Sequence, residues 1–96
     1  NFGPAPDDVL TVEDLVKASI QIFGKGHYDT VPQANTPHEA GLLLLDNSKA
    51  AEKLNWKPHF TSQEAINETI SWYATFKEQG AKEVTTAQIQ RFFEAQ

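Results

Sequence analysis

Two groups of residues in this chain have side chains that could take part in chemistry. Thr36, His38 and Glu39 place a hydroxyl, an imidazole and a carboxylate within four residues of a polar loop. Tyr73 and Lys77 have the spacing of a phenol–ammonium acid/base pair. The loop residues are candidates for binding a ligand, and the second pair is a candidate for proton transfer.

The Tyr73–Lys77 pair is better explained by the helix that contains it. Apolar residues recur there at spacings of three and four, so Tyr73 is predicted to face the core. Lys77 lies near the end of the same helix, where a solvated cation interacts favourably with the helix dipole. We therefore predict no catalytic residue in this chain.

A metal site is not expected either. The histidines are His27, His38 and His59, and no two of them are spaced four apart on a predicted helix. The chain contains no cysteine, which excludes disulfides and thiolate ligands and fits a cytoplasmic location. His38 can contact a ligand or another domain, or it can pair with Glu39 or point to water.

Length and composition indicate one small domain of residues 1–96. Apolar residues make up 40% of the chain, which supports a core, and the net charge is −5 with Arg91 as the single arginine. Without clustered basic residues, nucleic-acid binding is not expected. The apolar run Leu42–Leu45 is far shorter than the ~20 residues of a membrane span, and no secretory signal is seen. The absence of methionine suggests a piece of a longer protein.

Capping residues and apolar spacing predict four helices. One starts at Thr11 and ends before Gly24, one spans about 47–54, one spans about 62–79, and a short one is opened by Thr85. Very short strands are expected at 1–2, 27–31 and 42–45. The predicted fold class is therefore mostly α with minor β (α+β), with four helices and two or three very short strands. Phe92 and Phe93 must pack on this chain's own helices or on a partner.

Several segments occur in the order seen in the C-terminal lobe of extended short-chain dehydrogenase/reductases that act on nucleotide sugars. Within that superfamily the chain most resembles the CDP-glucose 4,6-dehydratases. The resemblance covers almost the whole chain and rests on Asn1-Phe2-Gly3-Pro4, Pro37-His38-Glu39-Ala40, Leu45-Asp46-Asn47-Ser48-Lys49-Ala50, Leu54-Asn55-Trp56-Lys57-Pro58 and Val84-Thr85-Thr86-Ala87-Gln88-Ile89.

The resemblance implies roles for the loop residues. Glu39 occupies the position whose carboxylate accepts hydrogen bonds from ribose hydroxyls, a role that suits its lone-pair sites. His38 lies beside it, and Thr36 stands where many relatives have an arginine that grips the diphosphate. A threonine hydroxyl donates one neutral hydrogen bond and adds no charge. Asn55 replaces a glycine at a helix end, where asparagine also tolerates the left-handed conformation.

The resemblance also implies a parent enzyme that converts CDP-glucose to CDP-4-keto-6-deoxyglucose with bound NAD. The Rossmann half that would hold NAD and the acid/base residues is absent here, because the chain has no Gly-rich dinucleotide motif. The expected function is to bind the CDP-sugar substrate as one lobe, without catalysis by this chain alone. The expected partners are the CDP-sugar and either the missing half or further copies of this chain.

Two alternatives remain open at the level of sequence. The chain can belong to another nucleotide-sugar epimerase or dehydratase, which differs in the base that it selects. It can also be a stand-alone helical interaction module, in which case oligomers are expected because its apolar helix faces need a cover.

Overall fold

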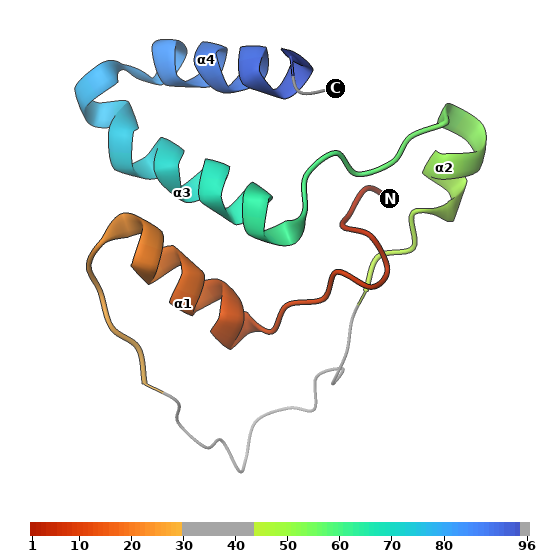
Figure 1. Ribbon diagram of the computed structural model, residues 1–96, viewed down its shortest axis with the longest axis horizontal. Helices are drawn as coiled ribbons and strands as arrows, with labels where there is room; N and C mark the ends of the chain where they lie inside the picture. The colour runs from red at the N-terminus through yellow and green to blue at the C-terminus, as the bar shows by residue number, and fades with distance from the viewer. Residues whose placement is uncertain (30–43, 95–96) are drawn as a thin grey trace.

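The computed structural model describes residues 1–29 and 44–94, and within these ranges it contains four α-helices. They are α1 (Val12–Phe23), α2 (Ser48–Leu54), α3 (Ser62–Gln79) and α4 (Ala81–Glu94). Figure 1 shows α3 between α1 and α4, with α2 apart from them beyond the loop that enters α3. Within the described residues α3 contacts α1 and α4, which do not contact each other, and the shortest extent of the molecule is 18 Å. The helices therefore form a single open layer.

The strands predicted from the sequence are wrong for the part of the chain that the structure describes. Residues 1–2, 27–29 and 44–45 form no strand, and the remainder of the predicted strands lies outside the described ranges. A short extended segment needs a neighbouring ladder of hydrogen bonds to become a strand, and these segments make side-chain contacts instead. Phe2 packs edge-on against Trp56 with ring centroids 5.0 Å apart, and Tyr28 binds Glu13. The described fold is all-α.

The predicted boundaries of the first three helices are largely confirmed, because their caps are local. The Thr11 and Thr61 hydroxyls each accept a hydrogen bond from the backbone N–H three residues later. The carboxylates of Asp14 and Glu64 in turn accept the backbone N–H of Thr11 and Thr61. Gly24 ends α1 in the left-handed conformation. Asn55 does the same for α2 with φ 52°, which confirms the prediction that this asparagine ends the helix in the left-handed conformation.

The predicted start of α4 is wrong by four residues. The sequence Thr85-Thr86-Ala87-Gln88 has capping-box spacing, but α4 begins at Ala81 because the carbonyl of Gly80 accepts the Val84 N–H at 3.1 Å. Thr85 and Gln88 bind α3 instead of capping α4. The Thr85 hydroxyl accepts the Trp72 indole N–H at 2.9 Å, and the Gln88 side chain donates to the Glu68 carbonyl at 2.7 Å.

Few side chains are buried: among the described residues, only Ala50 and Val84 are. Along α3, Ile66, Ile70 and Phe76 are partly buried, but Tyr73, which was predicted to face the core, is 58% exposed. Leu54 of α2 is 66% exposed. A single layer covers each helix along its sides only, so a residue on the open face stays accessible even when its spacing is apolar.

The capping carboxylates give the fold a predictable response to acid. Hydrogen bonds from the Thr61 backbone and side chain hold the pKa of Glu64 below its ordinary value. Since the folded pKa is lowered, the stabilisation is complete above the unfolded value near pH 4 and is lost as pH falls through the folded pKa. We expect the urea midpoint to fall between about pH 5 and pH 3. Glu64→Gln, which keeps a neutral capping group, should fall less steeply than wild type, and parallel pH profiles would contradict this.

Candidate functional site

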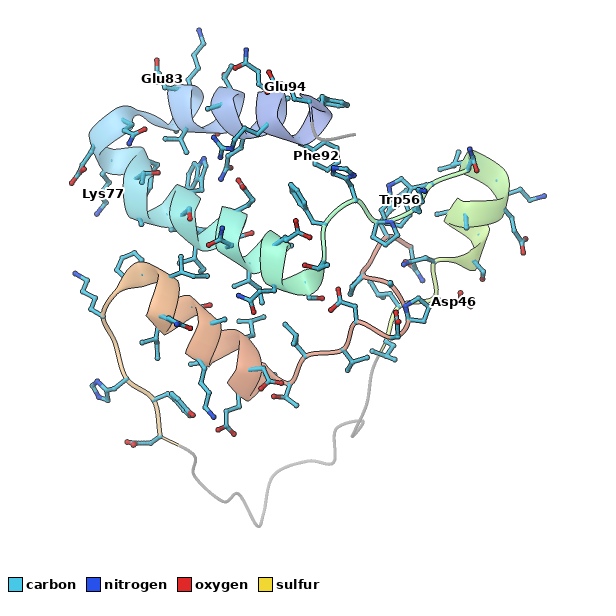
Figure 2. All side chains as sticks on the ribbon, in the orientation of Figure 1. Asp46, Trp56, Lys77, Glu83, Phe92 and Glu94 are labelled. Atoms are coloured by element: carbon cyan, nitrogen blue, oxygen red, sulfur yellow. The ribbon has the colours of Figure 1, made fainter. Side chains whose placement is uncertain are left out.

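Thr36, His38 and Glu39 lie outside the described residues, so the structure neither brings them together nor separates them. Tyr73 and Lys77, whose spacing resembles an acid/base pair, both lie within the described residues. Tyr73 packs edge-on against Trp72, with ring centroids 5.2 Å apart, on the open face of α3. Lys77 is exposed and projects from the end of α3 (Figure 2). The prediction that Lys77 is a solvated charge is confirmed, whereas the prediction that Tyr73 lies in the core is wrong.

The structure describes both chain segments that flank residues 30–43. On the first side, Gly24 and Gly26 adopt positive φ angles of 88° and 120°, and residues 25–28 return along α1. The Tyr28 hydroxyl then donates to the Glu13 carboxylate in the first turn of α1 at 2.9 Å. Lys17 lies 3.0 Å from the same oxygen.

The charges of this first flank reinforce one another. The Lys17 ammonium, and after it the Tyr28 hydroxyl, hold the pKa of Glu13 below its ordinary value, while Glu13 raises the pKa of Lys17. Both groups therefore stay ionised at neutral pH. Glu13 presents a carboxylate to two donors at once, one from its own helix and one from the segment that follows the helix.

On the second side, Asn47 ties the chain to the N-terminal segment. Its side-chain amide donates to the carbonyls of Gly3 at 2.8 Å and Pro4 at 3.0 Å. Leu45 lies so near that a Cβ on Gly3 would come within 3.2 Å of it. Asp46, Asn47 and Ser48 are all residue types that cap helices well. Within the described residues, however, the Asn47 side chain caps no helix and its buried Oδ1 has no partner.

Two apolar grooves meet at Trp56 and Pro58. One, of about 330 Å³, runs from Gly3 and Pro4 to Phe60 and Phe92. The other, of about 460 Å³, lies between residues 5–6, 44–48 and 56–58, and Asp46, Ser48 and Lys57 give it polar edges. Trp56 and Phe92 are labelled in Figure 2 on the two sides of the loop before α3. These grooves could accept apolar or aromatic groups.

Residues 1–29 and 44–94 show neither a metal site nor a membrane-spanning helix. No cluster of three or more histidine, aspartate or glutamate side chains there could hold a metal ion. No helix of these ranges has the length and apolar character needed to cross a membrane.

The sequence analysis did not predict the hydrogen bond between Tyr28 and Glu13 or those from Asn47 to the carbonyls of residues 3–4. The two glycines around Lys25 are a signal for a chain reversal, and a reversal directly after α1 would return Tyr28 along that helix. No comparable signal exists for Asn47. An asparagine before a helix reads as a cap, and its contact with residues 3–4 is more than 40 positions away.

Comparison with known proteins gives one relative with a clear match. The chain is 36% identical over 73 residues to the CDP-glucose 4,6-dehydratase of Salmonella typhimurium, a match that covers 76% of this chain and 20% of that protein. No family model matches, and no solved structure does. The chain spans about a fifth of the length of the curated relative that it matches. The chain therefore contains a region related in sequence to a CDP-glucose 4,6-dehydratase.

Proposed function

We propose that this chain is the part of a CDP-glucose 4,6-dehydratase-like enzyme that binds the nucleotide-sugar substrate. The observation that carries the proposal is the 36% identity over 73 residues to such a dehydratase. The open single layer of helices is consistent with a lobe that packs against a larger body. The proposal includes a cytoplasmic location and a parent chain of the length of that relative.

In this proposal, three residues of segment 36–39 contact the substrate. Glu39 accepts hydrogen bonds from the ribose hydroxyls, because a carboxylate can accept from both members of a vicinal diol. His38 lies beside it, and Thr36 donates one neutral hydrogen bond to the diphosphate. The chain contributes nucleotide recognition, which fixes the sugar in place for chemistry performed elsewhere.

NAD does not fit the described part of this chain. A dinucleotide site needs a strand, a Gly-rich turn and a helix N-terminus, and residues 1–29 and 44–94 contain no strand. NAD and the proton-transfer residues are therefore assigned to another part of the parent enzyme, and no catalytic step is assigned to this chain.

Isothermal titration calorimetry with CDP-glucose, UDP-glucose, GDP-glucose and dTDP-glucose tests the proposal. We expect the CDP-sugar to bind most tightly, without turnover. Glu39→Ala should weaken binding about tenfold, the effect of losing a hydrogen bond to a charged group. Glu52→Ala removes an exposed carboxylate of α2 and should leave affinity unchanged. A preference for another base would assign the chain to a different nucleotide-sugar enzyme, and no binding would overturn the proposal.

A second function is favoured by the exposed apolar side chains. Several large apolar side chains are more than half exposed, among them Phe2, Val12, Leu54 and Phe93. Such surface favours an interaction module that assembles with copies of itself. Light scattering decides between the two functions: a concentration-dependent oligomer that ignores all four nucleotide sugars would favour the module.

A further inference from the structure

Helix α4 lies at one edge of the helical layer (Figure 1). Among the described helices it contacts α3 alone. Its inner side carries the buried Val84, then Gln88, whose amide binds a carbonyl of α3, and Phe92, which packs on the loop before α3. These three residues recur every four positions and therefore form one stripe along the helix. Within the described residues, α4 uses this stripe to pack on its own chain.

The opposite side of α4 carries a second stripe, the outer stripe, made of Lys82, Thr86, Ile89 and Phe93. Nine positions, or two and a half turns, separate Val84 from Phe93, so their side chains leave the helix in opposite directions. Ile89 is 52% exposed and Phe93 is 66% exposed. Spacings of four, three and four residues are those of the contact positions between paired helices. The outer stripe therefore has the pattern of a helix that pairs with a second helix.

A groove beside the outer stripe can receive a side chain from outside. Its volume is about 280 Å³, and its apolar walls come from Phe60, Ile89, Phe92 and Phe93. An apolar cavity of about 150 Å³ already admits benzene, so a phenyl ring fits in the groove. The exposed ring of Phe93 is a group of this kind on the same surface. A surface that presents both a groove and the ring that fits it can pair with an identical surface across a two-fold axis.

We propose that the outer stripe of α4 is a dimer interface, in which two copies of this chain pair through antiparallel α4 helices that cross near Arg91. Phe93 of each copy then lies beside Ile89 and the groove of the other. Charge favours this direction. Parallel helices would bring the two Glu94 carboxylates together, whereas antiparallel helices place each Glu94 opposite the neutral Gln88. The inference rests on self-assembly, not on nucleotide binding, and it names the surface that assembles.

The size of the interface sets the expected affinity. Helix α4 has 14 residues and is about 21 Å long, so a pair of these helices buries less than the about 1,200 Å² of a standard interface. We therefore expect a concentration-dependent dimer with a dissociation constant weaker than about 1 µM. Sedimentation velocity of the full chain over a wide range of concentrations measures it.

Ile89→Glu tests the location of the interface, because it places a carboxylate in the middle of the outer stripe. We expect a monomer at every concentration, with the helix content of wild type. Val12→Glu is the matched control, since it makes the same change of charge at a more exposed apolar residue, 79% accessible, on α1. It should dimerise as wild type does. Phe93→Ala, which removes a ring without adding charge, should weaken the dimer about tenfold or more. Equal losses in Ile89→Glu and Val12→Glu would overturn the inference.

Spin labels test the direction of the helices. The chain has no cysteine, so Gln90→Cys or Lys82→Cys gives one label per copy. In the antiparallel dimer, positions 82 of the two copies lie nine residues on either side of the crossing, about 27 Å apart along the axis. The labels at 82 should therefore be farther apart than those at 90. Equal distances at the two positions would contradict the antiparallel pairing.

These results separate the interface from nucleotide binding. A wild-type chain that stays monomeric at every concentration would overturn the inference, assign the outer stripe to a partner other than this chain and leave nucleotide binding untouched. A dimer that Ile89→Glu abolishes, in a chain that binds no nucleotide sugar, would support the interface although the substrate-binding proposal fails.

Discussion

Gly80→Ala is expected to destabilise the chain by about 3 kcal/mol, because Gly80 has a backbone conformation that other residues rarely adopt. Its φ of 91° and ψ of 137° lie outside the left-handed helical region that asparagine and glycine share. A Cβ at this position would also collide with the Glu83 carboxyl group. That side chain is flexible and can move away, so most of the cost should come from the backbone.

The position of Gly80 prevents its neighbours from absorbing the change. Its N–H donates to the Phe76 carbonyl at 2.9 Å and ends α3, while its carbonyl accepts the Val84 N–H at 3.1 Å and starts α4. One residue thus connects two helices, and Val84 is one of the two buried residues that the structure describes. Any adjustment of Gly80 would tilt α4 on α3.

Gly24→Ala is the matched control, measured with Gly80→Ala by urea unfolding. Gly24 has a similar φ of 88° but a ψ of 2°, within the left-handed helical region, and nothing would touch its Cβ. Its expected cost is about 1–2 kcal/mol. Adding Glu83→Ala to Gly80→Ala should restore little. Equal losses at Gly24 and Gly80, or full recovery with Glu83→Ala, would contradict the backbone explanation.

The parts of this fold that could be predicted from sequence are the ones set by near neighbours. Thr11 and Thr61 start helices because their partners lie three residues away, and Gly24 and Asn55 end helices by their own conformation. Such signals need no knowledge of the rest of the chain. Thr85 has the same capping-box spacing but starts no helix, because α4 begins earlier, where the Gly80 carbonyl accepts the Val84 N–H. The Thr85 hydroxyl instead accepts the indole N–H of Trp72 in α3.

The failures concern burial and pairing between distant segments. Apolar periodicity shows which side of a helix is apolar, but it cannot show whether anything covers that side. Tyr73 was predicted to face the core and is exposed, as is Leu54 of α2, because one layer of helices leaves its faces open. The short predicted strands failed similarly, since a strand depends on a partner that the local sequence does not specify. The contact of Asn47 with residues 3–4 spans 43 to 44 positions and has no local signal. The contact of Tyr28 with Glu13 spans 15 positions, and the two glycines after α1 are its only signal in the sequence.

The aromatic cluster of His59, Phe60 and Phe92 is expected to contribute strongly to the stability of the fold. The Phe92 ring lies 4.9 Å from His59 and 5.2 Å from Phe60, edge-on in both cases, and joins α4 to the loop before α3. Sequence left open whether Phe92 and its neighbour Phe93 pack on this chain or on a partner. Phe92 packs on this chain, and Phe93 is 66% exposed.

Phe92→Ala is therefore expected to cost about 2–3 kcal/mol in urea unfolding, below the full value for a buried phenylalanine because the ring is only partly buried. Phe93→Ala removes the same side chain one position later and should cost less than about 1 kcal/mol. Phe92→Leu keeps apolar volume but loses the edge-on ring contacts, so its cost should fall between the two. Equal losses for Phe92→Ala and Phe93→Ala would mean that the cluster does not hold α4 in place. A Phe93 effect confined to oligomers would instead assign its exposed ring to contacts between chains.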